Sequence, residues 1–332
     1  MLATLALDPA AVLQARFATS PVWEAAAATR VLAQGAHTFH GTWVAQTRAA
    51  LRRTATALPT LDLLVPPSGH MADLLTPAPT GRAATLEDDL ARIRATPVEL
   101  VLEDLEHLAR STRSPERRRA LAEAARDPGA LLEAACTELA ALWRLCLAPA
   151  WPRLQALADA DIAHRGRRVA EVGVARALSE LHPRLRVDGD AVTIRTACLD
   201  EPLEAVPTEL VLVPCAFTWP DPLVLNHRAH PLTIAYAPRG VGTLWQTSAA
   251  ADGLAGLTGG TRAHALRLLD IPMTTSQLAE QLALTPATVS EHLQILARAG
   301  VVRAERQGRR VYYARTPLGD GLVTGAVAGV PA

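Results

Sequence analysis

The sequence predicts an α+β fold in which helices predominate. Prolines divide residues 1–182 into segments whose apolar residues recur with helical spacing. Residues 183–248 change to the two-residue alternation of strands, and the last quarter holds two short helical patterns followed by two short strands. We therefore expect a helical N-terminal region, a small antiparallel sheet and a compact C-terminal module.

Helix starts in the first region are marked by a capping residue followed by proline, which suits the first turn because its missing N–H would have no partner there. These dipeptides are Asp8-Pro9, Ser20-Pro21, Ser114-Pro115 and Asp127-Pro128. Leu86–Leu108 is amphipathic, and Pro97 must break that helix or begin a new one. Ile162–Leu181 predicts another helix, whereas the proline-rich segment 59–81 predicts an ordered loop.

Strand spacing begins near residue 184. Leu185–Val187 and Ala191–Arg195 flank Asp188-Gly189-Asp190, a hairpin signal because Asp-Gly tolerates the positive φ of a tight turn. Further short strands are expected at Glu209–Phe217, Leu223–His227, Leu232–Ala237 and Val241–Trp245. Ala249–Gly260 is rich in alanine and glycine and predicts a hinge.

These patterns suggest the following organisation of the chain. Residues 1–182 form a mainly helical domain, and residues 183–248 form a β-rich part of the same effector and dimerisation region. A hinge at 249–260 leads to a C-terminal module at 261–317 and a short tail at 318–332.

The C-terminal module opens at Thr274 with its first helix. Thr275 or Ser276 can cap it, because a hydroxyl satisfies a free backbone N–H at a helix start. Its apolar residues fall on one face: Leu278, Ala279 and Leu282.

The second helix of the module begins at Pro286 and ends at Gly300, a residue that tolerates positive φ. Its inward stripe is Val289, Leu293 and Leu296. Val301–Ala304 and Arg310–Ala314 then alternate as strands around an arginine-rich glycine turn. Helix, turn, helix and a two-stranded wing make a winged helix-turn-helix, which places its second helix in the DNA major groove.

The charge distribution agrees with binding to phosphates. Residues 258–316 hold eight arginines and four acidic residues, a net charge of +4, in a chain whose formal net charge is zero. A basic module on a mildly acidic remainder is typical of a DNA-binding head. The alternative is that these helices pack on another protein.

Thr285–Leu293 resembles the recognition helix of ArsR-type repressors, and Gly300–Val302 with Arg306–Tyr313 resembles the wing that follows it. The resemblance implies a homodimeric repressor that binds a palindromic operator in double-stranded DNA and leaves it when a small-molecule effector binds. The implied DNA contacts are Thr285, Ala287, Thr288, Ser290, Glu291, His292, Gln294, Arg306, Gln307, Arg309 and Arg310.

The chain departs from the metal-sensing members of that family. Gln277–Leu284 has no Cys or His, and the segment 318–332 has only Asp320 as a carboxylate. We therefore expect no metal site and no cofactor. The region upstream resembles an uncharacterised domain that precedes ArsR-type modules in actinomycete proteins. The residues that carry this resemblance are Gln14–Glu24 and Arg165–Pro183.

All six tryptophans lie upstream of the module. Tryptophans most often pack cores, but they also line apolar ligand pockets. The speculative effector pocket is formed by Phe217, Trp219, Tyr236 and Trp245.

Metal-binding and catalytic patterns elsewhere are weak. His37/His40 could share one side of a helix, whereas the spacing of His227/His230 is not expected to bring the rings together. Two groups of residues could be catalytic but lack a supporting catalytic motif. They are Ser68-Gly69-His70 with Asp62, and the acidic stripe Glu99, Glu103 and Glu106 with His107. We expect a solvated face from the stripe and assign no catalytic residue.

Composition limits the remaining classes. The four cysteines lack CxxC spacing, which fits a reducing cytoplasm. The first residues are not typical of a signal peptide, and no apolar run is long enough to span a membrane. We expect a cytoplasmic, non-enzymatic, sequence-specific transcription regulator. The alternative is a small-molecule-binding protein or enzyme that uses the winged helix for dimer or protein contacts, which salt-dependent DNA binding would distinguish.

Overall fold

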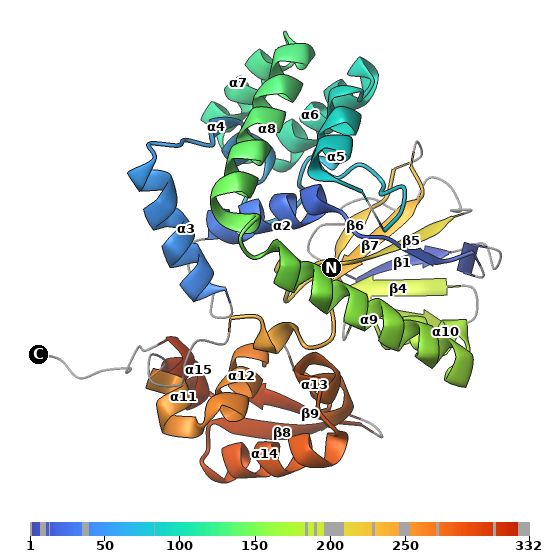
Figure 1. Cartoon of the computed structure of the whole chain (residues 1–332), viewed down its shortest axis with the longest axis vertical. Coiled ribbons are helices and arrows are strands. Elements are labelled where there is room, and N and C mark those ends of the chain that lie inside the picture. The colour runs from blue at the N-terminus through green and yellow to red at the C-terminus, as the bar shows by residue number, and fades with distance from the viewer. Residues whose placement is uncertain are drawn as a thin grey trace, which may run out of the picture. The chain divides into compact units, whose positions relative to one another are not determined.

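The computed structural model describes twelve segments of the chain (Figure 1), namely residues 2–6, 11–12, 14–34, 40–82, 84–182, 185–188, 191–195, 209–227, 230–245, 253–269, 272–307 and 310–324. The chain divides into two compact units. The N-terminal unit comprises Met1–Gly35 and Val44–Ala237, and the C-terminal unit comprises Ala36–Trp43 and Pro238–Ala332. Among the described helices, none combines the length and the apolar character needed to cross a membrane.

Helices make up most of the N-terminal unit, as predicted. They are α2 (Pro21–Gln34), α3 (Gly41–Arg53), α4 (Pro59–Leu64), α5 (Leu86–Arg94), α6 (Val98–Ser111), α7 (Pro115–Ala124), α8 (Pro128–Leu142), α9 (Trp151–Val172) and α10 (Val174–Ser179), with the 3-10 turn η1 (Asp73–Leu75) and the π-helical segment η2 (Trp143–Leu147). The proline-marked starts of α2, α7 and α8 are confirmed, and the side chains of Ser114 and Asp127 accept N–H groups of the helices that follow. Asp8-Pro9 lies outside the described residues.

Two helical predictions need correction. The expected loop at 59–81 contains α4 and η1, because the Glu138 carboxylate accepts the free N–H groups of Thr60 and Leu61 at the start of α4. The helix expected at Ile162–Leu181 is two helices, α9 and α10, since Gly173 between them has a φ of +82°. Pro97 begins a new helix, α6, as one of the two predicted alternatives.

The strands of this unit form two sheets. β1 (Leu2–Ala6), β4 (Ala191–Arg195) and β3 (Leu185–Asp188) are antiparallel in that order, which confirms the two strands of the predicted hairpin. The second sheet has the order β2 (Arg16–Phe17), β5 (Leu210–Pro214), β7 (Leu232–Tyr236) and β6 (Leu223–Leu225). It is mixed, and not antiparallel throughout as predicted, because β5 runs parallel to both β2 and β7.

β5 and β7 are buried along their whole length, as parallel strands covered on both faces usually are. The two strands pack on Leu178 of α10 and on Leu181. Cys215, directly after β5, donates its thiol hydrogen to the carbonyl of Trp23 in α2. A buried polar cluster joins α9 to the sheet. Tyr236 donates its hydroxyl hydrogen to Asp161 at 2.6 Å, and Asp161 lies 3.3 Å from the Arg165 guanidinium.

The described part of the C-terminal unit consists of short helices and one two-stranded hairpin. Its elements are the 3-10 turn η4 (Val241–Thr243), α11 (Gly253–Thr258), α12 (Gly260–Leu268), α13 (Thr275–Leu282), α14 (Pro286–Arg298), β8 (Val302–Gln307), β9 (Arg310–Arg315) and α15 (Pro317–Thr324). One expectation is wrong here, because Val241–Trp245 is not a strand: Gly240 turns the chain with a φ of +81°. Residues 253–258 of the expected hinge form α11, and the hinge itself stays a prediction.

Candidate nucleic-acid interface

The first helix of the candidate interface, α13, begins with a capping box. The Thr274 hydroxyl accepts the N–H of Gln277 at 3.3 Å, and the Gln277 side chain accepts the N–H of Thr274 at 2.9 Å. The cap is therefore Thr274, one residue before the predicted Thr275 or Ser276. The sequence held a signal for this cap, since Thr274 and Gln277 have the Thr-x-x-Gln spacing of a capping box.

The apolar stripes predicted for α13 and α14 form the core between them. Leu278, Ala279 and Leu282 of α13 are buried, and so are Val289, Leu293 and Leu296 of α14. The Thr285 side chain caps α14 by accepting the N–H of Thr288 at 3.2 Å, directly before Pro286. Gly300 ends the helix with a φ of +71°.

This packing exposes a polar face on α14. Ala287, Glu291 and Gln294 are exposed, while Thr288, Ser290 and His292 flank them and are half-buried. All six were predicted as DNA contacts. Ile295 (40% exposed) and Arg298 lie on the same exposed face and were not predicted. Their spacing of four and seven residues from Glu291 was the signal available in the sequence.

Two predicted contacts, Thr285 at the cap of α14 and His292 on the helix, each have a polar side-chain atom that faces the protein. The Thr285 hydroxyl lies 2.9 Å from that of Thr288, in addition to capping the helix. Nδ1 of His292 is buried and has no hydrogen-bond partner among the residues that the structure describes. In this ring orientation, Nε2 is the nitrogen of His292 that is left to contact a ligand.

The wing is the antiparallel hairpin of β8 and β9. Its register pairs Arg306 with Val311 and Gln307 with Arg310. Because successive side chains alternate across a strand, Arg306 and Arg310 project from opposite faces of the hairpin. Both are exposed, whereas Arg309 lies outside the described residues, and only the backbone of Gln307 is described.

The base of the wing is fixed to the helices. Met273 and Tyr313 exchange two backbone hydrogen bonds of 3.0 and 2.7 Å, which joins the segment before α13 to β9. Arg315 donates to the carbonyl of Leu266 at 2.8 Å and to the Asp320 carboxylate at 2.7 Å. Arg315 thus holds the end of α12.

The residues of the speculative effector pocket are distributed over both units. Phe217, Trp219 and Tyr236 are buried in the N-terminal unit, and none of the four lines the pocket described below. Trp245 belongs to the C-terminal unit, where its N–H donates to Nδ1 of His40 at 2.8 Å and its ring stacks on that of Trp43.

The histidine patterns have mixed outcomes. The rings of His227 and His230 lie 5.9 Å apart between centroids, so the expectation that their spacing keeps the rings apart was wrong. His227 also contacts Glu103 at 3.2 Å. Cys215, near this pair in sequence, is buried and donates its thiol hydrogen to Glu24 at 3.2 Å. His37 lies outside the described residues.

His70 and the acidic stripe of α6 also differ from expectation. Nε2 of His70 lies 3.2 Å from Asp104, on α6, and the ring of His107 lies 4.2 Å from that of His70. Glu99 and Glu106 are exposed, as a solvated face requires, but Glu103 and His107 are half-buried.

Comparisons with known proteins match the two regions separately. Residues 260–305 match a family described as "Helix-turn-helix domain", and residues 101–240 match "Family of unknown function (DUF5937)". A 45-residue stretch is 44% identical to the "Uncharacterized HTH-type transcriptional regulator YbzH" of Bacillus subtilis (strain 168). That stretch covers 14% of this chain and 45% of the relative. No solved structure matches.

The helix-turn-helix match spans α12 to β8 and so coincides with the helices, core and first wing strand described above. The second match covers α6 to β7. The chain thus joins a C-terminal helix-turn-helix domain of the ArsR type to an N-terminal domain from a family of unknown function.

Proposed function

We propose that this chain is a sequence-specific transcription regulator whose helix α14 reads bases in the DNA major groove. The observation that carries the proposal is the exposed polar face of α14, opposite a stripe of buried residues that fixes the helix on α13. The head acts as one half of a homodimer on a palindromic operator, with half-sites about 34 Å apart.

The exposed side chains of α14 suit base edges. Gln294 has an amide that can both donate and accept, the arrangement that pairs with adenine in the major groove. The Glu291 carboxylate can accept from the amino group of cytosine. Thr288 and Ser290 lie beside this face and can reach a base or a phosphate oxygen.

The wing supplies contacts of a different kind. Arg306 and Arg310 are exposed on opposite faces of the hairpin and can reach phosphates on either side of a groove. Arg309, between them in the sequence, is proposed to share this role. Contacts to phosphates position a protein on DNA and are largely independent of sequence.

The N-terminal unit is proposed to bind the effector and to supply dimer contacts. Within the part of the head that the structure describes, α15 has eight residues, which is little helix for a dimer interface. We propose repression, with release from the operator when the effector binds. This is the mode of action that the resemblance of the head to ArsR-type repressors implies.

Fluorescence anisotropy with DNA from the chain's own promoter region tests the proposal. We expect tight binding to one palindromic segment, much weaker binding to scrambled DNA, and a steep loss of affinity as salt increases. Equal and weak binding to both DNAs, without salt dependence, would instead favour a role of the winged helix in protein contacts.

A further inference from the structure

Two pairs of metal-binding side chains with the same spacing meet in the N-terminal unit. His70 and Asp73 are three residues apart around the start of η1, and Asp104 and His107 are three residues apart on α6. One ligand atom from each of His70, Asp73 and Asp104 lies within 4.8 Å of the other two. The His107 ring lies against that of His70.

The distances suit a small cation. Ligand atoms at about 2.1 Å from a tetrahedral metal ion are separated from one another by about 3.4 Å. Nε2 of His70 and Oδ1 of Asp104 already lie 3.2 Å apart. A modest approach of the Asp73 carboxylate would complete three ligands.

Asp104 is held in place for this role by its other oxygen. Oδ2 of Asp104 accepts the backbone N–H of Leu74 at 2.7 Å, which leaves Oδ1 directed toward His70. The side chain is 7% exposed. A backbone contact of this type orients a carboxylate ligand and fixes which oxygen is available.

Asp73 lacks such a contact. Its carboxylate receives no hydrogen bond from any part of the chain that the structure describes, although its backbone carbonyl accepts the Thr76 hydroxyl at 3.2 Å. Asp73 is half-buried, and a bound cation would give its carboxylate a partner.

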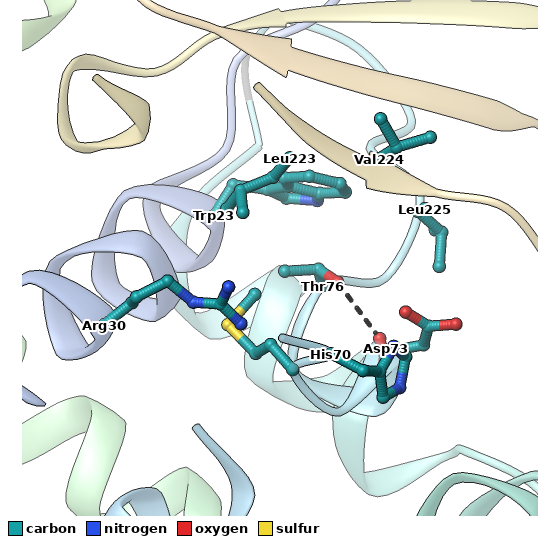
Figure 2. Close-up of a pocket in the computed structure, with 9 residues that line it drawn as sticks. Trp23, Arg30, His70, Asp73, Thr76, Leu223, Val224 and Leu225 are labelled. Atoms are coloured by element: carbon teal, nitrogen blue, oxygen red, sulfur yellow. Dashed lines mark hydrogen bonds between the residues drawn. The ribbon is translucent and has the colours of Figure 1, made fainter. Parts of the chain in front are cut away.

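The cluster opens into a pocket. Figure 2 shows His70 and Asp73 near one another on one side, with Trp23 and Leu223 across from them and Arg30 nearby. The space beside the cluster is about 20 Å³, enough for about one water-sized ligand.

Arg30 carries the charge that opposes a cation here. Its Nη1 donates to the carbonyl of Gly69 at 2.8 Å, so the guanidinium is fixed beside the cluster. The two carboxylates, Asp73 and Asp104, carry more negative charge than the positive charge of the one guanidinium. With a divalent ion bound, the positive charge of Arg30 would favour an anion at the open coordination position.

We propose that His70, Asp73 and Asp104 bind a divalent first-row transition metal ion of the Zn²⁺ or Mn²⁺ class, with the remaining positions open to the pocket. One imidazole and two carboxylates form a mixed nitrogen and oxygen donor set, which suits these ions better than Ca²⁺ or Cu⁺. The site lies in the N-terminal unit.

Calorimetric titration of the untagged full chain, stripped with EDTA, tests this site with Zn²⁺ and Mn²⁺ in separate experiments. We expect one equivalent of one of these ions to bind. Asp73→Asn should lower that affinity more than about tenfold. Glu106→Gln is the matched control, because Glu106 is exposed on the same helix as Asp104 and should bind as the wild type does.

The proposal is overturned if the wild type binds neither ion. It is also overturned if Asp73→Asn and His70→Gln both bind with wild-type affinity, because the ion would then lie elsewhere. Far-ultraviolet circular dichroism separates loss of binding from loss of folding, and His70→Gln replaces Asp73→Asn if the latter does not fold. No DNA is present, so the outcome is independent of the proposed regulator function.

Discussion

The two units of this chain use polar side chains in opposite ways. In the C-terminal unit, the polar residues of α14 lie on the solvent side of a helix whose other side is apolar. In the N-terminal unit, charged residues are buried and meet partners far away in the sequence, as Glu24 meets Ala216 and Asp161 meets Tyr236. The polar side chains of α14 are therefore available to a binding partner. Many polar side chains of the N-terminal unit instead form hydrogen bonds within that unit.

The largest effect expected from this contrast is at the buried pair Asp161 and Arg165. Arg165→Met should lower the free energy of unfolding by about 3–5 kcal/mol, because Asp161 would stay buried without its cation. Urea denaturation measures the loss. Arg167→Met, exposed on the same helix, should change stability by less than about 0.5 kcal/mol. Equal effects of both changes would contradict the structural role of the buried pair.

Glu24 gives a second test, through pH. Burial raises the pKa of Glu24 from 4.5 to about 7, despite hydrogen bonds from Ala216, Cys215 and Phe217 that favour the charged form. The folded state thus holds the proton more tightly than the unfolded state. Its contribution to stability is fully present below pH 4.5 and is lost as the pH rises through about 7.

The matching variant is Glu24→Gln, which stays neutral at every pH. Relative to the wild type, it should gain roughly 3 kcal/mol of stability between pH 4.5 and pH 7.5. Thermal and urea unfolding across this range measure the difference between the two proteins. A difference that does not change with pH would show that Glu24 is ionised throughout.

A smaller effect is expected in the head, where stability depends on local contacts. Thr274→Ala should lower stability by about 1 kcal/mol, because it removes the cap of α13. Ser276→Ala is the matched control and should have little effect, since Ser276 makes no cap contact in the capping box. Urea unfolding of both variants measures the two losses of stability. A larger loss in Ser276→Ala than in Thr274→Ala would favour Ser276 as the cap and contradict the observed cap, Thr274.

The contrast between the two units also explains which parts of the structure could be predicted from the sequence. The core of the head was predicted correctly because Val289, Leu293 and Leu296 follow the helical period within one segment. The helix starts at Pro21, Pro115 and Pro128 were also local signals. The mixed sheet was not predicted, because the parallel pairing of β2 with β5 joins residues that lie far apart in the sequence.

The metal-binding cluster shows the same limit. His70-x-x-Asp73 and Asp104-x-x-His107 are short and common patterns, and neither indicates the other. Only the packing of α6 beside η1 brings them together. Glu103 and His107 were expected on a solvated face because the helical period alone does not show that His70 and His227 cover part of it.

The central claim is that α14 reads bases while the wing holds phosphates. Its most direct test is anisotropy binding of Gln294→Ala and Arg310→Ala to the operator, to single-base variants of it and to scrambled DNA, across a salt series. Gln294→Ala should cost about 1–3 kcal/mol at one operator position and leave the salt slope unchanged. Arg310→Ala should weaken binding to every sequence and reduce the salt slope by about one unit. If both variants act equally on all DNA, the assignment of base-reading and phosphate-binding residues is contradicted.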